Sequence, residues 1–307
     1  MTVSASAIRK IASRFPKIEI KPDEIMSRHC SFKIGGPAAA VVFPETEEDI
    51  AGVCELLKET GIKPFIMGNG TNLLFTDGKL DRVVIKTGNR VSEIRKTGSE
   101  TLSACCGATL AKLAETALDM GLSGLEFACG IPGTLGGAVV MNAGAYGGEM
   151  KDVISRTYYL DEELTPRAVE GKEQEFSYRR SVFSDTDKTI MRCDIDLKPE
   201  DPEKIRAEMR SIAEKRRNSQ PIDKPSAGSV FKRPENGYAA ALIEASGLKG
   251  FGIGGAAVSE KHAGFIINRG NATFEDVIKL IEHIRETVYA DTGVDLETEI
   301  KIVGKSQ

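Results

Sequence analysis

The first part of the chain combines helical spacing of apolar residues with short strand-like runs. Residues 4–15 are predicted to form a peripheral helix, with these apolar positions on one side: Ala7, Ile8, Ile11, Ala12 and Phe15. The run AAAVVF that follows is predicted to be a strand, and Thr46 with Asp49 forms a capping-box pattern before a helix that stops at Gly61. A short strand over residues 64–67 then runs into GNGTNLL. The pattern predicts a βαβ unit at the start of the chain.

The middle of the chain alternates between strand-like and helical segments. Thr109 is predicted to cap a helix that runs through Met120 and ends at Gly121. Strands are predicted on both sides of this helix, the first three as neighbours in a meander: 82–86, 91–96 and 101–106 before it, and 152–160, 165–170 and 190–197 after it.

The last third of the chain begins with a charged helix that starts at Asp201-Pro202 and runs to about Arg217. The segment NSQPIDKPSAG, residues 218–228, contains two prolines and is predicted to link two domains. A module of about 80 residues follows, with these elements: a strand SVFK, a helix over 238–246, strands near 255–258 and 264–268, a helix capped by Thr273 and Asp276, and a final strand LETEIKIV.

Length and composition exclude several classes of protein. A chain of 307 residues with 41% hydrophobic content can bury a core and is predicted to form two or three domains. A formal charge of −4 and a pI near 5.7 argue against nucleic acid as the main partner, because such binding usually needs a large basic face. No stretch approaches 18 consecutive apolar residues, and the amino terminus lacks the apolar core of a secretion signal, so a cytoplasmic protein is predicted.

The cysteines and histidines indicate neither disulfides nor a metal site. The six cysteines form no CxxC pair, and the three histidines are widely scattered. We therefore expect reduced, buried thiols and no bound metal.

The most unusual stretch is GIPGTLGGAVVMNAGAYGG, residues 130–148. Glycine lets main-chain N–H groups approach a ligand closely, so the stretch predicts a site where backbone amides hold an anion, and its length suits a diphosphate. Tight turns at sheet corners are the alternative. The stretch contains no GxxxxGK[ST] and no GxGxxG between a strand and a helix, which excludes the two familiar phosphate loops.

A second glycine-rich turn, GNGTN at residues 68–72, follows a predicted strand. Alone it is as typical of a plain turn as of a binding site. Together, two turns rich in amide donors could hold the two sides of one diphosphate.

Three polar residues stand out by their placement, although each has an ordinary structural explanation. Arg179 in SYRRSVF lies between aromatic residues, which suggest that it is partly buried. A buried guanidinium needs an anionic partner, and local acids could supply it. Ser229 begins a predicted strand, where a capping serine is common. Glu299 is expected on the face opposite the alternating apolar residues of the last strand, where a surface carboxylate is the default.

The chain as a whole resembles the UDP-N-acetylenolpyruvoylglucosamine reductase family, the flavoenzymes of peptidoglycan precursor synthesis. Seven motifs carry the resemblance, in order along nearly the whole chain: SFKIGGPA (31–38), MGNGTNLLF (67–75), GIPGTLGGAVVMNAGAYG (130–147), SYRRSVF (177–183), PSAGSVFKRP (225–234), GGAAVSEKHAGFIIN (254–268) and LETEIKIVG (296–304).

This resemblance implies an α+β protein with an FAD-binding part of the vanillyl-alcohol-oxidase (PCMH) type in two subdomains and a C-terminal substrate-binding domain. The expected division is 1–67 for the first FAD-binding subdomain, to which the C-terminal strand could return, 68–217 for the second, and 218–307 for the substrate domain. The expected FAD contacts are Gly68, Asn69, Gly70, Thr71, Asn72, Gly130, Ile131, Pro132, Gly133, Gly136 and Gly137, with Asn142 and Gly144 near the flavin. The first loop contains no His or Cys, so a noncovalent flavin is expected.

The resemblance also implies the reaction and its residues. NADPH would reduce FAD, and the reduced flavin would transfer hydride to the enolpyruvyl group of UDP-N-acetylglucosamine enolpyruvate to give UDP-N-acetylmuramate. Hydride addition to an unsaturated carboxylate pushes negative charge onto the carboxylate, so a fixed cation or acid is needed there. By resemblance Arg179 and Glu299 meet this need and Ser229 protonates the adjacent carbon. The expected substrate contacts are Tyr146, Lys232, Arg233 and His262.

Two features differ from the family pattern. Ser219 stands where many relatives have a lysine, so a diphosphate contact could be absent or pass to Arg217. Between Arg179 and Ser229 only one strand and one helix fit, which indicates the shorter subtype without a tyrosine-bearing lid loop.

Two other functions stay open from the residues. An FAD-dependent oxidase or dehydrogenase of the same fold, acting on a hydroxyacid or sugar, would keep both glycine-rich turns but has no reason to carry Arg179, Ser229 and Glu299 in these contexts. A noncatalytic nucleotide-sugar binding protein is the other alternative, and bound yellow flavin would count against it.

Overall fold

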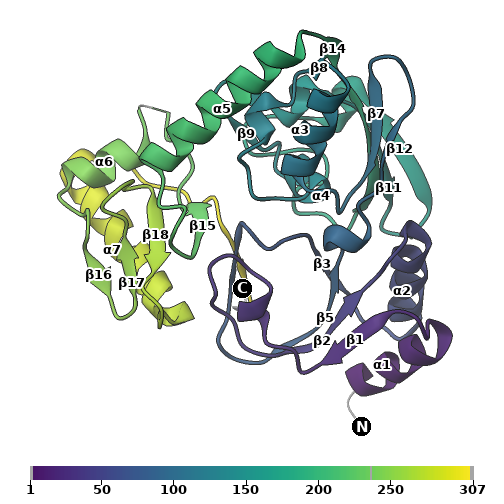
Figure 1. The fold of residues 1–307 in the computed structure, drawn as a ribbon. Coiled ribbons are helices and arrows are strands. Elements are labelled where there is room, and N and C mark those ends of the chain that lie inside the picture. Colours follow the sequence, from purple (N-terminus) through teal and green to yellow (C-terminus); the bar gives the residue numbers. More distant parts are fainter. Residues whose placement is uncertain (1–2, 236, 305–307) are drawn as a thin grey trace. The chain divides into compact units, whose positions relative to one another are not determined.

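The chain is described here by a computed structural model that covers residues 3–235 and 237–304 (Figure 1). The contacts group these residues into two compact units. Unit 1 contains the described residues up to Pro22, together with Ala39–Asn69 and Asp81–Lys215. Unit 2 contains Asp23–Ala38, Gly70–Leu80 and the described residues from Arg216 onward. Each unit is thus assembled from three separate stretches of sequence, and the functional division at 67/68 and 217/218 stays a prediction.

The first sheet of unit 1 has four strands in the order β1-β2-β5-β3. Their bounds are Glu19–Pro22 for β1, Ala38–Phe43 for β2, Leu80–Lys86 for β5 and Phe65–Met67 for β3. Helices α1 (Val3–Arg14) and α2 (Glu47–Glu59) pack against each other beside this sheet (Figure 1). All six residues of β2 are buried, as the unbroken apolar run predicts, and the predicted capping box of Thr46 and Asp49 is present.

The second sheet of unit 1 has five antiparallel strands in the order β12-β11-β13-β7-β6. Their bounds are Pro166–Glu170, Ile154–Leu160, Thr189–Asp196, Thr101–Cys105 and Ile94–Lys96. Thr109 caps α3 (Leu110–Asp119) as predicted, and two short pairs complete the unit: β8 (Leu122–Ser123) with β14 (Lys198–Pro199), and β9 (Gly144–Ala145) with β10 (Gly148–Glu149).

The predicted meander of 82–86, 91–96 and 101–106 is wrong for its first strand. Only β6 and β7 pair with each other, whereas β5 pairs in parallel with β3 in the other sheet. The reason lies in the continuous apolar run Val83 to Ile85, which is fully buried and therefore needs cover on both faces. Strand β6 is largely exposed and offers no such cover.

Unit 2 contains a four-stranded antiparallel sheet in the order β15-β18-β17-β16. The strands span Ser226–Ser229, Phe265–Asn268, Ala256–Val258 and Gly252–Ile253, and the helices are α6 (Ala239–Ala245) and α7 (Phe274–Thr292). The predicted capping box at Thr273 is present, and one face of α7 is buried. A separate parallel pair joins β4 (Leu73–Phe75) to β19 (Lys301–Val303).

Three further boundaries differ from the sequence predictions. Helix α5 (Pro202–Ser219) continues into the predicted linker. The strand expected over SVFK ends at Ser229, because Phe231 makes only an isolated bridge to Thr298. The last strand shrinks to three residues, and its alternation fails because Val303 is 7% exposed while Ile302 is 39% exposed.

The SFKIGGPA motif is held in unit 2 by hydrogen bonds to distant segments. The Ser31 hydroxyl donates to the Ser226 carbonyl at 2.6 Å, and the Asn268 amide donates to the Phe32 carbonyl at 3.0 Å. The Gly36 amide donates to the Thr76 carbonyl at 2.8 Å. These bonds explain why residues 23–38 group with the C-terminal part of the chain.

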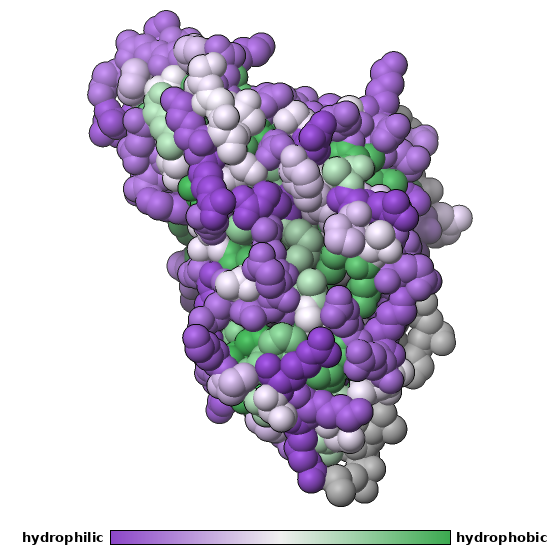
Figure 2. Space-filling model, turned by 90° about the vertical axis from the view of Figure 1, so that its right-hand side faces the viewer, coloured by the Kyte–Doolittle hydropathy of each residue, from purple (hydrophilic) through white to green (hydrophobic). Residues whose placement is uncertain are grey.

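The visible surface is mostly polar, with apolar residues in small separate groups (Figure 2). No helix within the described residues is both long and apolar enough to cross a membrane.

Two neighbouring glycines of unit 2 give a matched test of this packing. A Cβ at Gly36 would lie 2.1 Å from the Asp77 carbonyl oxygen, whereas a Cβ at Gly78 would have no atom closer than 3.7 Å. We expect Gly36→Ala to lower the free energy of unfolding by more than about 2 kcal/mol, and Gly78→Ala to change it by less than about 1 kcal/mol. Urea denaturation of both variants measures the difference. Equal free energies of unfolding for the two variants would show that the fold does not depend on the close approach at Gly36.

Candidate active site

The glycine-rich stretch 130–148 folds into a turn, a short helix and a hairpin. Helix α4 spans Leu135–Val140 and is followed by the hairpin of β9 and β10. Glycine allows close packing at position 136, because a Cβ there would lie 3.0 Å from the Cβ of Cys106, tighter than an ordinary contact. Gly137 on the next position is exposed, and a Cβ there would be 3.6 Å from its nearest neighbour, the Thr134 hydroxyl. Part of the glycine content thus serves close packing within the protein, not approach of a ligand.

Several amides of the turn are already used by the protein. The N–H groups of Leu135 and Gly136 donate to the carbonyls of Ala108 and Cys106, each at 2.8 Å. The Gly133 amide donates to the Ile131 carbonyl at 2.9 Å. The expectation that the whole turn presents its amides to an anion is therefore too broad.

Other amides in the two glycine-rich turns have no protein acceptor among the described residues. In the GNGTN turn these are the consecutive N–H groups of Gly68, Asn69, Gly70 and Thr71. In the second turn they are the N–H groups of Gly130, Thr134 and Gly137. Thr134 is a buried residue of unit 1. A buried backbone donor is rarely left without an acceptor, so the unit 1 donors at positions 68, 69, 130, 134 and 137 fit a bound anionic group such as a diphosphate.

Within unit 1 the two turns touch each other. A Cβ at Gly68 would lie 2.0 Å from the Thr134 hydroxyl oxygen, so only glycine allows this approach. The contact brings the first amide donor of the GNGTN turn beside the start of α4. Sequence spacing could not have predicted this contact, because 65 residues separate these positions.

Arg179 lies in a four-residue turn of unit 1. The Ser177 and Arg180 backbones exchange two hydrogen bonds, of 3.0 and 3.2 Å, and Arg179 between them has φ of 56°, in the left-handed region. The guanidinium donates to the Gly144 carbonyl at 3.3 Å and lies 5.1 Å from the centre of the Tyr178 ring. Arg179 is thus close to the hairpin that follows α4.

Asn142 connects this hairpin to the Arg179 turn. It is fully buried, with φ of 43°, and its amide nitrogen donates to the Ser177 carbonyl at 3.0 Å and to Glu149 Oε2 at 2.5 Å. Its carbonyl oxygen accepts from the Lys151 amide at 2.9 Å. The side chain predicted to lie near the flavin is therefore held on both ends by protein groups.

Ser229 and Glu299 are brought together within unit 2. The Glu299 amide donates to the Val230 carbonyl at 2.7 Å, and the neighbouring residues Phe231 and Thr298 form an antiparallel bridge. Ser229 precedes this pairing directly and pairs with Phe265 on its other side. The Ser229 side chain has no hydrogen-bond partner within the described residues, and the residue is half-buried. Its hydroxyl is therefore available to a ligand.

The GNGTN turn reaches the same place in unit 2. The Asn72 side-chain amide donates to the Glu299 carbonyl at 3.2 Å, and the Lys301 amide donates to the Asn72 carbonyl at 2.9 Å. The parallel pairing of β19 with β4 continues from this point. Three predicted site segments, at positions 72, 229 and 299, thus lie side by side.

The predicted substrate contacts have different surroundings. Tyr146 is 44% exposed at the tip of the hairpin. Lys232 forms an ion pair with Glu297. The Arg233 guanidinium lies 4.3 Å from the centre of the Tyr238 ring. His262 is half-buried, and its Nδ1 accepts from the Gly264 amide at 3.2 Å.

Three of the six cysteines are unreactive because of burial. Burial raises the pKa of Cys105 to about 11 and that of Cys54 and Cys106 to about 12. The thiols are therefore protonated at neutral pH and poor nucleophiles.

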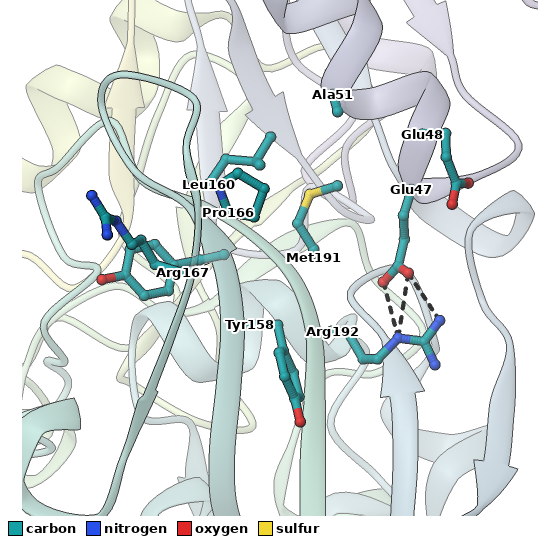
Figure 3. Close-up of a pocket in the computed structure, with 10 residues that line it drawn as sticks. Glu47, Glu48, Ala51, Tyr158, Leu160, Pro166, Arg167, Met191 and Arg192 are labelled. Carbon is teal, nitrogen blue, oxygen red and sulfur yellow. Dashed lines mark hydrogen bonds and ion pairs between the residues drawn. The ribbon is translucent and has the colours of Figure 1, made fainter.

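A pocket of about 380 Å³ lies elsewhere in unit 1, over α2 and the strands β11, β12 and β13 (Figure 3). Its lining contains none of the predicted site residues. Figure 3 shows the carboxylate of Glu47 facing Arg192, with Nη2 to Oε2 at 2.9 Å. Arg167 also has a carboxylate partner, Asp161 at 3.0 Å. Both guanidiniums in this lining are already paired within the protein, so we do not assign the pocket to the reaction.

Comparison with known proteins agrees with the arrangement of these motifs. Residues 38–163 match the family described as an FAD binding domain, and residues 220–303 match the C-terminal domain of UDP-N-acetylenolpyruvoylglucosamine reductase. The UDP-N-acetylenolpyruvoylglucosamine reductase of Caldanaerobacter subterraneus subsp. tengcongensis is 48% identical, over 92% of this chain and 93% of the relative. That of Syntrophomonas wolfei is 44% identical, over 94% and 97%.

Solved structures give the same result for the fold. The crystal structure of UDP-N-acetylenolpyruvylglucosamine reductase from Thermus caldophilus aligns with a TM-score of 0.80 at 30% identity, covering 94% of this chain and 99% of the other. An alkyldihydroxyacetonephosphate synthase aligns over 64% of this chain with a TM-score of 0.50 at 13% identity, which reflects the fold alone. The predicted α+β fold with an FAD-binding part of the PCMH type is confirmed.

The surroundings of His262 lead to a prediction about its charge. Burial lowers the pKa of His262 below the ordinary value of about 6.5, and repulsion from Lys249 acts in the same direction. The folded chain therefore binds this proton less readily than the unfolded chain. The associated stability is present above the ordinary pKa and is lost as the pH falls from there through the folded pKa.

We expect the His262 ring to titrate below about pH 6.5 in the folded protein and to be neutral at pH 7. Titration of the ring protons by NMR measures this, with His262→Gln to assign the signal and the urea-unfolded chain as reference. A folded-state pKa at or above that of the unfolded chain would contradict the prediction.

Proposed function

The chain belongs to the UDP-N-acetylenolpyruvoylglucosamine reductase family, and from this premise we propose how its residues carry out the reaction. The protein is an FAD-dependent oxidoreductase of peptidoglycan precursor synthesis, with NADPH as hydride donor. It reduces the enolpyruvyl group of UDP-N-acetylglucosamine enolpyruvate to give UDP-N-acetylmuramate.

We propose that the amide donors of the two glycine-rich turns hold the FAD diphosphate. The proposal is supported by the N–H groups of residues 68, 69, 130, 134 and 137 in unit 1, which have no protein acceptor among the described residues. The GNGTN turn contains no His or Cys, which supports a noncovalent flavin. The FAD held by these residues would supply the hydride transfer from NADPH to the methylene carbon of the substrate.

Arg179 and Glu299 are proposed to stabilise the substrate carboxylate as it gains negative charge. Arg179 supplies a fixed positive charge, and Glu299 acts as an acid that donates a hydrogen bond. The Arg179 backbone is held in an unusual left-handed conformation, with φ of 56°. Such strain is retained where the surrounding structure fixes it, often at functional sites.

Ser229 is proposed to protonate the carbon next to the carboxylate. A serine hydroxyl is a weak acid in water, but the carbanion-like species formed by hydride addition is strongly basic. The single observation that carries this proposal is the Glu299 N–H to Val230 carbonyl bond of 2.7 Å, which joins the segments that bear Ser229 and Glu299.

Tyr146, Lys232, Arg233 and His262 are proposed to contact the UDP-sugar part of the substrate. Lys232 would have to share or leave Glu297 to meet a phosphate. His262 would act as a neutral hydrogen-bonding group, because burial lowers its pKa.

We also propose that the protein works in the cytoplasm and does not bind nucleic acid. Six free cysteines support a reducing compartment. The formal charge of −4 supports the second point.

The direct test is NADPH oxidation by the purified protein with and without UDP-N-acetylglucosamine enolpyruvate. We expect a flavin absorbance spectrum and NADPH oxidation that depends on this substrate. Turnover with a hydroxyacid or sugar, and none with the enolpyruvyl substrate, would instead support the alternative oxidase or dehydrogenase.

The role of Ser229 is tested by Ser229→Ala in the two half-reactions, followed separately by stopped-flow absorbance. Reduction of the flavin by NADPH should keep its rate, because Ser229 takes no part in it. Reoxidation by the enolpyruvyl substrate should slow by about 10² to 10⁴-fold, the usual contribution of a general acid. Ser229→Thr, which keeps a hydroxyl, is the matched control. Full reoxidation rate in Ser229→Ala would remove Ser229 from this role.

A further inference from the structure

We propose that Asn142 is a positioning residue that holds the Arg179 turn in its reactive geometry, and that its side chain does not bind the cofactor directly. This inference rests on the role proposed above for Arg179. The sequence placed Asn142 only near the flavin, and the inference assigns its side chain a role in holding another part of the protein.

The side-chain hydrogen bonds of Asn142 are taken up by the protein. An asparagine amide nitrogen has two N–H donors, and here they donate to the Ser177 carbonyl and to Glu149 Oε2. The oxygen accepts from the Lys151 amide, and the residue is fully buried. Both donors are thus occupied, so the amide has none left to offer a ligand.

The Ser177 carbonyl that Asn142 holds belongs to the turn that carries Arg179. The Ser177 and Arg180 backbones close this turn through two hydrogen bonds, so fixing the Ser177 carbonyl fixes the entry to the turn. Arg179 lies two residues further on, and its guanidinium reaches back to the Gly144 carbonyl, two residues after Asn142.

The exit of the same turn is fixed by serine side chains. The Ser181 and Ser184 hydroxyls both donate to the Val140 carbonyl at 2.8 Å, at the C-terminal end of α4. The residues two positions before and two positions after Arg179, Ser177 and Ser181, are thus both hydrogen-bonded to one short segment of unit 1, residues 140–142. The left-handed φ of Arg179 needs such support, because a non-glycine residue in this region costs about 1 kcal/mol or more.

Asn142 also determines the surroundings of Glu149. The Glu149 carboxylate accepts from Asn142 through one oxygen and forms an ion pair with Lys151 through the other. The carboxylate on the hairpin is thereby held by its own neighbours. Loss of the Asn142 donors would take this bond from one Glu149 oxygen and leave the Ser177 carbonyl with the Arg180 amide alone.

The test uses Asn142→Asp in the flavin-loaded enzyme. Aspartate keeps the size of the side chain, the acceptor for the Lys151 amide and the tolerance of a left-handed backbone. It loses both N–H donors and also places a second carboxylate against Glu149. We expect reoxidation of the flavin by the enolpyruvyl substrate to slow by about 10- to 100-fold, the usual cost of a misplaced catalytic group. Reduction by NADPH should stay within about twofold, and the flavin spectrum should be unchanged.

A double-mutant cycle with Arg179→Ala separates this inference from the proposed role of Arg179. If Asn142 acts through Arg179, the variant with both substitutions should be no slower than Arg179→Ala alone. A full additional loss in the double variant would overturn the positioning role. If Arg179→Ala alone has no effect on reoxidation, the proposed role of Arg179 fails. The failure of the positioning role and the failure of the Arg179 role therefore give different results.

Hydrogen exchange gives a readout that does not depend on activity. We expect faster amide exchange over residues 177–184 in Asn142→Asp than in the unchanged chain. Tyr158→Phe is the matched control, because it removes a 2.9 Å side-chain bond to Asp194 elsewhere in unit 1. If Asn142→Asp does not fold, Ser181→Ala tests the hydrogen bond on the other side of Arg179, and the same slowing of reoxidation is expected. Unchanged exchange and equal slowing of both half-reactions would overturn the inference.

Discussion

The hydrogen bond from the Glu299 amide to the Val230 carbonyl is the interaction on which the arrangement of unit 2 depends. It holds the C-terminal segment against the segment that follows Ser229, and the Asn72 side chain adds a third segment at the Glu299 carbonyl. Three stretches that are far apart in the sequence thus meet through main-chain groups. A contact of this kind fixes backbone positions closely, and the Ser229 hydroxyl beside it has no hydrogen-bond partner within the described residues.

The two glycine-rich turns show how glycine serves two purposes in one motif. At Gly136 the missing Cβ allows close packing on Cys106, and the amide is used by a protein carbonyl. At Gly137 there is room for a Cβ, and the amide has no acceptor among the described residues. A buried donor without an acceptor costs about 1–3 kcal/mol, so a ligand that bonds the amide of buried Thr134 would offset a cost of the protein fold.

Local sequence patterns predicted most of the elements but not their pairing. The capping boxes at Thr46 and Thr273 were read correctly, because the side chain and the amide that it caps are three residues apart. The sheet to which β5 belongs was predicted wrongly, because the apolar pattern of a strand does not indicate which sheet the strand joins. The last strand was predicted too long, at residues 296–303, because the sequence does not show that its partner is the three-residue strand β4.

The candidate site was predictable where a motif carried it and unpredictable where distant residues support it. Arg179, Ser229 and Glu299 followed from resemblance, whereas neither periodicity nor spacing pointed to the serine hydroxyls that bond the Val140 carbonyl. The only signal was the density of small polar residues around Arg179. The left-handed backbone conformation of Arg179 is unfavourable for any residue other than glycine. The strain is tolerated because bonds on both sides of the residue fix the turn, and a turn fixed in this way orients a guanidinium before any substrate arrives.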